Sequence, residues 1–133
     1  MREFHLQIVT PDGLVFDGSA ESILVRADSG DVEIMAAHTD YFATLGTGRA
    51  RLTAASESRE AASSGGFISV KDGNVKLVCT TFEFADEIDL ARAEAARERA
   101  EAAIKRAQSD SELAVASAKL KRALSRISVA KSR

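Results

Sequence analysis

The chain of 133 residues contains one cysteine, one proline, one tyrosine and no tryptophan. A single cysteine excludes an internal disulfide and a cysteine-rich metal cluster. Because Cys79 lies in a run typical of a strand, we expect it to be a small buried hydrophobic side chain. No apolar run approaches the roughly 18 residues that mark a membrane-spanning helix, and no signal peptide follows Met1. We therefore expect a soluble, cytoplasmic protein.

A second set of absences divides the chain in two. All eight glycines, all six phenylalanines and the only proline, tyrosine and cysteine lie at or before Phe84. Beyond that point Ala, Leu, Glu, Lys and Arg dominate, and these residues favour helices, whereas glycine, proline and aromatic residues are typical of turns and strands. The change near Asp86 predicts a β domain over residues 1–85 and a helical domain over residues 86–133.

Charge is also unevenly distributed, although the formal net charge is only −2. Residues 1–85 carry 7 basic and 12 acidic side chains, whereas residues 86–133 carry 11 basic and 8 acidic ones. From Leu113 to the end there are six basic residues and no acidic one. This asymmetry predicts an anionic partner for the helical domain.

Short apolar runs separated by turn residues characterise the first domain. The clearest hairpin joins residues 67–70 to residues 75–81 through Asp72-Gly73, a pair suited to the positive φ angles of a two-residue turn. Val75, Leu77 and Cys79 alternate along the second strand, so we expect them on one face. Other strands are expected near residues 4–8, 14–16, 22–27, 32–35, 42–45 and 49–53, with a turn at residues 56–58. This spacing is typical of a β sandwich or barrel, and we predict an antiparallel sandwich.

Past Glu83 the hydrophobic period changes from two to about 3.6. Asp86 is a candidate cap for a helix from about residue 87 to 107, and Ser109, with Glu112, for a helix from about residue 110 to 129. The expected apolar faces are Ala93, Ala96, Ala100, Ala103, Ile104 and Ala107 on the first helix and Leu113, Ala116, Leu120, Ala123, Leu124 and Ile127 on the second. We predict an α+β fold in which a C-terminal antiparallel two-helix hairpin, weakly held because alanine buries little area, follows the sandwich.

Catalysis finds little support in the sequence. His5 and His38 are far apart and accompany no recognisable nucleophile, and the glycines form neither a Walker loop nor a dinucleotide fingerprint. We expect neither enzymatic activity nor a set of metal ligands. Two alternatives stay open, a sandwich enzyme with a pocket within residues 1–85 and a nucleic-acid adaptor that uses the basic second helix. The scarcity of aromatic residues and the negative net charge argue against the adaptor.

Four arginines of the helical domain suggest a ligand. Arg92 and Arg99 share one helical face, as do Arg122 and Arg126 on the other helix. Antiparallel pairing around a turn near Asp110 brings all four within roughly 10 Å along the hairpin axis, a length suited to a polyphosphate. On spacing alone, the base rate favours the alternative that these arginines form weak surface ion pairs with Glu94, Glu98 and Glu101.

A family resemblance extends through the chain and bears on this choice. Its residues are VTPDG at 9–13, SG at 29–30 before His38, SGGF at 64–67 and RISVA at 126–130. In this order and spacing the chain resembles the epsilon subunit of bacterial F-type ATP synthases. The segment Ile88-Asp89-Leu90-Ala91-Arg92-Ala93 is similar to the I/L-D-x-x-R-A motif associated with ATP binding in that family. The resemblance therefore favours a phosphate-binding role for the arginines.

The resemblance implies a non-catalytic subunit of the central stalk that helps to couple the rotor ring to the catalytic head and regulates ATP hydrolysis through its hairpin. The catalytic sites would lie on other subunits. It implies ATP as a regulatory ligand, without a metal, contacted by Glu83, Ile88, Asp89, Arg92, Ala93, Arg99, Arg122 and Arg126. A purely structural stalk subunit of the same complex, without a nucleotide site, is the alternative.

Further expectations concern partners and location. The resemblance implies contacts with the gamma subunit and the rotor c-ring through Ser29, Gly30, Asp31 and His38. An inhibitory basic helix that carries Lys119, Lys121, Arg122, Arg126 and Lys131 would meet the alpha and beta subunits of the catalytic head. The expected location is peripheral, at the cytoplasmic face of the bacterial plasma membrane, with no nucleic-acid partner.

The match departs from the family pattern in two places. Glu33, Ala36 and Asp40 stand where the family has a glycine and two prolines, which removes rigidity and adds two acids near His38. Ala61-Ala62 replaces bulkier strand residues and predicts a thinner core at that point.

Overall fold

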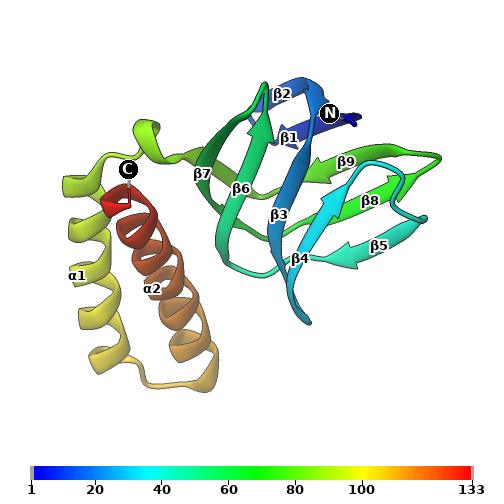
Figure 1. Ribbon diagram of the computed structural model, residues 1–133. Helices are drawn as coiled ribbons and strands as arrows, with labels where there is room; N and C mark the ends of the chain where they lie inside the picture. The colour runs from blue at the N-terminus through cyan, green and yellow to red at the C-terminus, as the bar shows by residue number, and fades with distance from the viewer. Residues whose placement is uncertain (1, 133) are drawn as a thin grey trace.

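A computed structural model describes residues 2–132 as two packed five-stranded β-sheets with a helical hairpin beside them (Figure 1). In spatial order the first sheet consists of β2 (Gly13–Ala20), β1 (Phe4–Thr10), β9 (Asn74–Val78), β8 (Phe67–Lys71) and β5 (Tyr41–Thr44). The second consists of β10 (Thr81–Phe84), β7 (Glu57–Ser64), β6 (Gly48–Ala54), β3 (Ser22–Ala27) and β4 (Gly30–Met35). Neighbouring strands are antiparallel except for β1 and β9, which are parallel. The predicted β sandwich is confirmed.

The core of the sandwich lies between the two sheets. Alternate residues of β1 point into it, because Phe4, Leu6 and Ile8 are buried while the residues between them are not. Leu6 and Ile8 meet fully buried residues of the opposite sheet such as Ile23 and Ile34 in one apolar cluster. Burial of these branched side chains is the main stabilising contribution to the sandwich.

The predicted hairpin around Asp72-Gly73 is confirmed. Both residues have positive φ angles, 51° and 80°, and join β8 to β9. The strand expected to continue to Thr81 is wrong, because β9 ends at Val78 and the chain crosses to the other sheet as β10. The crossing point requires Gly66, since a Cβ there would lie 1.8 Å from the carbonyl oxygen of Val78.

The turn expected at residues 56–58 is also wrong in position. The chain reverses at Ala55 and Ser56, whose φ angles are 52° and 63°, and Glu57 already begins β7. No glycine, proline or asparagine marks this reversal, and the serines at positions 56 and 58 placed the expected turn slightly too late. The backbone N–H of Ser56 donates a hydrogen bond of 2.8 Å to Oε1 of Glu21, which supports the strained turn.

The first long helix begins later than predicted. A short 3₁₀ turn, η1 (Ala85–Glu87), precedes α1 (Leu90–Arg106), and the buried residue Ile88 lies in extended conformation between them. Asp86 therefore does not cap α1, and Asp89 does so by accepting a hydrogen bond from the backbone N–H of Arg92. Ser109 caps α2 (Asp110–Lys131), as predicted.

The two helices meet along an alanine seam. Ala93 and Ala100 of α1 and Ala116 and Ala123 of α2 are buried, as expected. The expectation is wrong for Leu113 and Leu124, which are 43% and 48% exposed. Because residues seven apart follow one line along a helix, the seam continues along Ala116, Ala123 and Ala130 and leaves these leucines beside it.

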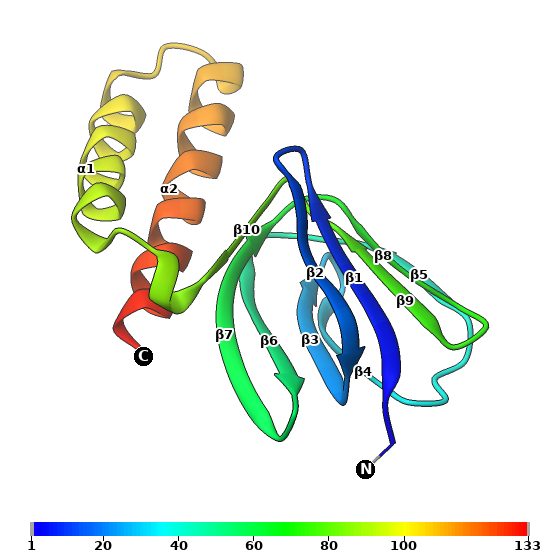
Figure 2. The same cartoon turned by 90° about the horizontal axis from the view of Figure 1, so that it is seen from above.

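The end of α2 seats the hairpin on the sandwich, and α2 lies between α1 and the second sheet (Figures 1 and 2). A small apolar cluster joins Ala62 of β7 to Ala85, Ile88, Val129 and Ala130. Ala61 points into the sandwich core and is fully buried, whereas Ala62 points toward the hairpin. Ala61 therefore adds little side-chain volume to the core, and the small side chain of Ala62 lets the hairpin approach the sheet closely.

Candidate functional site

A cavity of about 350 Å³ lies where the sandwich and the hairpin meet. Its walls come from the end of β10, the segment before α1, the first half of α1 and the second half of α2. The lining residues are Glu83, Glu87, Ile88, Asp89, Arg92, Ala93, Ala96, Arg99 and Arg126. Small-molecule sites commonly enclose about 300–1,000 Å³, so the cavity is large enough for a ligand.

Strand alternation directs Glu83 toward this cavity. Its neighbours Phe82 and Phe84 are buried in the sandwich core, so Glu83 points to the opposite face of the sheet. There its Oε1 accepts a hydrogen bond of 2.9 Å from Nε of Arg126 on α2. This ion pair connects the last strand of the sandwich directly to the second helix.

The start of α1 supplies the next part of the site. Asp89 caps the helix, and its Oδ1 accepts the hydrogen bond of 3.1 Å from the N–H of Arg92. The side chains of Arg92 and Arg99 lie two helical turns apart on the face that lines the cavity. Within residues 2–132 neither forms an ion pair. The two guanidinium groups can therefore act as donors to a ligand.

The alternative in which the arginines pair with glutamates of the hairpin is not what the structure shows. In the described part of the chain, no ion pair joins an arginine to Glu94, Glu98 or Glu101. Glu94 lies 4.0 Å from Nζ of Lys131 instead. The guanidinium groups of Arg92 and Arg99 are therefore available for other contacts.

The cavity brings together seven of the eight residues expected to contact ATP. Arg122 is the exception, since it lines two neighbouring grooves with Thr47, Ser64 and Thr81 and not the cavity itself. Glu87 and Ala96 also line the cavity and were not expected there. Glu87 directly precedes the Ile88-Asp89 motif, and this position in the sequence could have indicated that Glu87 lines the cavity. Binding of ATP at this position stays a prediction.

The residues expected to contact gamma and the rotor ring fall into two groups. Ser29, Gly30 and Asp31 lie at the turn between β3 and β4, and Asp31 pairs with Nε of Arg26 at 3.0 Å. His38 lies in the loop after the other end of β4, where its Nδ1 is 2.7 Å from the carbonyl oxygen of Thr39. Strand β4 separates them, so they do not form one compact patch.

The loop around His38 has its own support. Oδ1 of Asp40 accepts a hydrogen bond of 3.0 Å from the backbone N–H of Asp72 in the β8–β9 turn. The His38 ring lies edge-on to Tyr41, with 5.7 Å between ring centroids. Asp40, which stands where the family pattern has a proline, thus ties the loop to the neighbouring turn.

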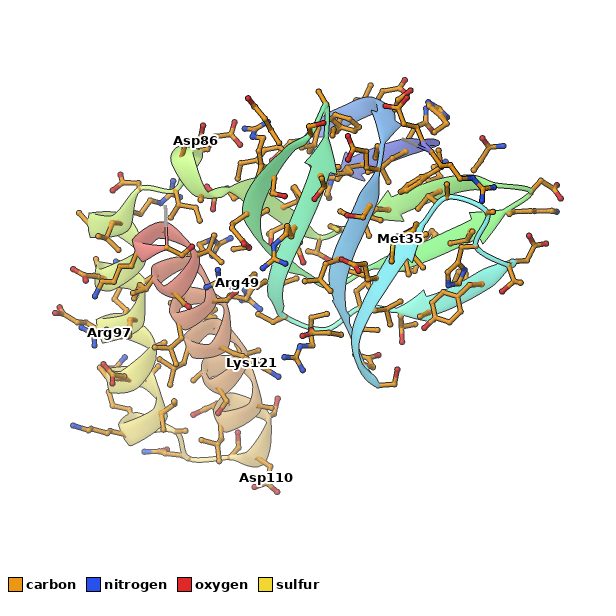
Figure 3. All side chains as sticks on the ribbon, in the orientation of Figure 1. Met35, Arg49, Asp86, Arg97, Asp110 and Lys121 are labelled. Atoms are coloured by element: carbon orange, nitrogen blue, oxygen red, sulfur yellow. The ribbon has the colours of Figure 1, made fainter. Side chains whose placement is uncertain are left out.

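The basic residues of α2 do not share one face of the docked hairpin. Lys119 and Lys121 are exposed, and Figure 3 shows Lys121 on the side of α2 nearer the sandwich. Arg122 and Arg126 are half-buried against the sandwich, and Lys131 lies beside Glu94. A continuous basic surface would require the helix to leave this position.

A polar latch, missed by sequence reasoning, fastens the end of α2. Arg49 of β6 points toward α2 (Figure 3) and donates hydrogen bonds of 3.2 Å to the hydroxyl groups of Ser128 and Ser132. Its guanidinium also lies 3.4 Å from Oε2 of Glu60, and the other carboxylate oxygen of Glu60, Oε1, accepts a hydrogen bond of 3.0 Å from Nε of Arg51. No motif marks these residues, because they meet only through the tertiary fold.

Two further features were sought in residues 2–132, and neither is present there. No group of three or more His, Cys, Asp and Glu side chains is placed to hold a metal ion. No helix in this range is long and apolar enough to cross a membrane.

Comparisons with known families cover nearly the whole chain. Residues 3–85 match the model of the β-sandwich domain of the ATP synthase delta/epsilon chain. Residues 86–131 match the model of the long α-helix domain of the same chain.

Individual proteins agree with these matches. The chain is 38% identical over 130 residues to the ATP synthase epsilon chain of Bacillus velezensis, covering 98% of each chain. It is 40% identical over 99 residues to that of Priestia megaterium, covering 74% of each. Among solved structures, a chain of the Euglena gracilis mitochondrial ATP synthase, described as OSCP/F1/c-ring, matches with a TM-score of 0.78 and 20% identity. That match covers 90% of this chain and 76% of the other, and at this identity it shows a shared fold.

Proposed function

Because the chain belongs to the ATP synthase delta/epsilon chain family and resembles its bacterial epsilon chains throughout, we propose that it serves in the central stalk of an F-type ATP synthase. In this role it is a non-catalytic subunit that helps to couple the rotor c-ring to the catalytic head. Its partners are the gamma subunit, the c-ring and, through the hairpin, the alpha and beta subunits. It acts at the cytoplasmic face of the bacterial plasma membrane as a peripheral component.

We further propose that the hairpin responds to ATP. The observation that carries this proposal is the cavity at the junction, whose walls come from β10, α1 and α2 together. A ligand that contacts all three elements binds only the docked hairpin. At a concentration 100 times its dissociation constant, such a ligand stabilises the docked form by about 2.7 kcal/mol.

In this proposal the lining residues make different contacts with ATP. Arg92 and Arg126 contribute the main contacts to the phosphates, and Arg99 extends the same face of α1. Asp89 orients the start of α1 through its capping hydrogen bond. Glu83 contributes a polar contact away from the phosphates, while Ile88 and Ala93 provide apolar wall.

The opposite state follows from the weakness of the hairpin seam. Alanine contacts bury little area, so the docked arrangement is held mainly by the small cluster and the polar contacts at the end of α2. When ATP is scarce, the hairpin opens and its basic helix meets acidic surfaces of the catalytic head, which obstructs rotation in the direction of hydrolysis. Abundant ATP returns the hairpin to the sandwich.

A purely structural stalk subunit is the competing function, and one observation favours it. Two carboxylates of the cavity already have partners, Glu83 in Arg126 and Asp89 in the N–H of Arg92. In that case the polar cluster would serve only to lock the hairpin against the sandwich.

A calorimetric titration of the full chain with ATP distinguishes the two functions. The nucleotide proposal expects saturable binding at or below millimolar ATP, weakened on the order of tenfold or more by Arg92→Ala or Arg126→Ala. Lys105→Ala is the control. Lys105 is exposed, and its substitution removes the same charge at the far end of α1. Absence of saturable binding by the folded protein refutes the ATP response and leaves the stalk role in place.

ATP hydrolysis by the assembled complex tests whether ligand binding in the cavity controls the hairpin. With wild-type chain, inhibition should decrease as ATP rises through the concentration range of binding. With Arg92→Ala the inhibition should persist to higher ATP. If inhibition by both proteins has the same ATP dependence, the cavity does not control the hairpin.

A further inference from the structure

A second hollow, of about 450 Å³, lies between α1 and α2 near the turn that joins them, and we call it the outer groove. Ala103, Val115 and Ala116 form its apolar wall, and Arg106 and Lys119 bring positive charge to it. Figures 1 and 2 show that this end of the hairpin points away from the sandwich. The outer groove is therefore formed by the hairpin alone.

The outer groove continues the cavity at the junction along one face of the hairpin. On α1, Arg92 and Arg99 line the cavity and Arg106 lines the outer groove. On α2, Arg126 lines the cavity and Lys119 lines the outer groove. Residues seven apart follow one line along a helix. The two hollows therefore lie end to end between the helices, on the same side of the hairpin.

Most of the cations that line the two hollows are unpaired. Within residues 2–132, Arg92, Arg99, Arg106 and Lys119 form no ion pair. Arg126 differs, because it pairs with Glu83. Unpaired cations along a narrow groove between two helices attract an anion to it.

The carboxylates that line the two hollows do not offset this charge, because each already accepts a hydrogen bond within the chain. The donors are the guanidinium of Arg126 for Glu83, the N–H of Phe84 for Glu87, the N–H of Arg92 for Asp89 and the N–H of Gln108 for Glu112.

The spacing of the unpaired cations indicates the length of a ligand that would contact them all. Arg92 and Arg106 are separated by about 21 Å along the axis of α1, given the 1.5 Å rise per residue. The triphosphate of a single nucleotide is too short to reach both. A ligand that contacts the whole row must be a longer chain with charge repeated along it.

The outer groove also indicates the kind of chain. No aromatic ring of the described residues lines it, so the bases of a nucleic acid would have no surface on which to stack. An acidic peptide directs its side chains to more than one side, and only some of its charges could face a groove between two helices. Inorganic polyphosphate carries charge on every unit and has no side group, and arginine is well suited to bind phosphate oxygens.

We propose that the cavity and the outer groove together bind inorganic polyphosphate, with Arg92 and Arg99 at the inner half and Arg106 and Lys119 at the outer half. The bound chain contacts both helices and stabilises the closed hairpin by mass action. It competes with ATP for the inner half. The outer half does not depend on the proposed ATP site, because Arg106 and Lys119 do not line the cavity.

The test is a calorimetric titration of the full chain with long-chain sodium polyphosphate and, separately, with sodium tripolyphosphate. Ionic strength is matched and divalent cations are absent. The long chain should bind on the order of tenfold or more tighter than tripolyphosphate, because it contacts two further cations. Prior saturation with ATP should weaken the binding of both.

Variants assign the extra affinity to the outer groove. Arg106→Ala and Lys119→Ala should each weaken binding of the long chain several-fold and leave tripolyphosphate unchanged. Lys105→Ala and Lys121→Ala are the matched controls, since each removes the same charge at a position that lines neither hollow. Both controls should leave both ligands unchanged. All four side chains are exposed, and unchanged circular dichroism identifies the folded variants.

Three outcomes overturn the proposal. The first is a long chain that binds no tighter than tripolyphosphate. The second is an equal loss of affinity in the outer-groove variants and their controls, which would mean that only the total charge matters. The third is loss of tripolyphosphate binding in Arg106→Ala, which would place a separate anion site at the end of the hairpin.

The proposal and the ATP response fail separately. Long-chain binding that depends on Arg106, without saturable binding of ATP, supports polyphosphate as the ligand and refutes the ATP response. Saturable ATP binding, with no advantage for the long chain over tripolyphosphate, overturns the polyphosphate proposal and leaves the ATP response in place.

Discussion

Glu83 and Arg126, 43 residues apart, form an ion pair of 2.9 Å that joins the last strand of the sandwich to the second helix. Their side chains are 40% and 29% exposed, so solvent screens the pair. We therefore expect Arg126→Ala to destabilise the docked hairpin by about 1 kcal/mol or less. Native-state hydrogen exchange should show weaker protection of Ala123 and unchanged protection of Ile68 in the sandwich core.

Lys119→Ala is the matched control for this change. Lys119 lies on the same helix, is exposed and forms no ion pair within residues 2–132. Equal loss of protection in the two variants would mean that the charge of α2, and not its bond to Glu83, holds the hairpin.

Asp89 should matter first as a helix cap. Asp89→Ala removes the acceptor for the N–H of Arg92 and should cost about 1 kcal/mol of stability in chemical denaturation. Asp89→Asn should cost less, because asparagine also caps helices well. Ser109→Ala, which removes the corresponding cap of α2, is a control with a similar cost. If Asp89→Asn is as damaging as Asp89→Ala, the negative charge is required and the cap is secondary.

Ala62 tests how closely the hairpin must approach the sheet. It is 5% exposed and packs in the small cluster with Ile88, Val129 and Ala130. Ala62→Leu inserts volume into this contact and should weaken docking by about 1–3 kcal/mol. The amides of α2 should then exchange faster while those of the sandwich keep their protection. Ala91→Leu, on the exposed surface of α1, should have little effect. A docked Ala62→Leu protein would show that the interface has spare room.

The sequence is sufficient to predict the two-domain order, the helical hairpin and most of the residues that line the cavity at the junction. Composition changes at the domain boundary, and the spacing of Arg92 and Arg99 places both on one helical face. Spacing within the helices could not decide where Arg122 points. That direction depends on how α2 is turned about its axis against the sandwich, where Val129 and Ala130 pack in the small cluster with Ala62.

Other features depend on tertiary contacts that no local pattern records. Arg49 binds Ser128 and Ser132, about 80 residues away along the chain, so neither end of the latch identifies the other. The reversal at Ala55 and Ser56 contains no glycine, proline or asparagine, and the hydrogen bond that the Ser56 N–H donates to Glu21 supports it.

That reversal gives a stabilising substitution. Ala55 has a φ angle of 52°, a conformation that costs a non-glycine residue about 1–2 kcal/mol. Ala55→Gly removes this strain and loses part of the gain to greater freedom of the unfolded chain, so a net stabilisation of about 0.5–1 kcal/mol is expected. Ala54→Gly, one residue earlier in β6, should destabilise instead. Denaturation midpoints measure both, and a less stable Ala55→Gly protein would contradict the strain argument.

Cys79 should be chemically inert while the protein is folded. It is 1% exposed, and burial raises the pKa of its thiol from 9.0 to about 12. At pH 8 only about one thiol in ten thousand would then be ionised, and the thiolate is the form that alkylating reagents attack. Alkylation by iodoacetamide should therefore be slow and should follow the rate of unfolding as denaturant is added. Fast alkylation without denaturant would show that the segment between β9 and β10 opens readily.

The same shift in pKa predicts a loss of stability in alkali. Since the folded pKa of Cys79 lies above the unfolded value of 9.0, the folded state keeps the proton that the unfolded state releases. The stability that the protonated thiol contributes is complete below pH 9 and is lost as pH rises toward 12. The loss amounts to about 1 kcal/mol at pH 10. Chemical denaturation at pH 8 and pH 10 measures it, with Cys79→Val as the control that lacks the thiol. The wild-type protein should lose more stability than the variant between these two pH values, because lysine and tyrosine titration affects both proteins equally.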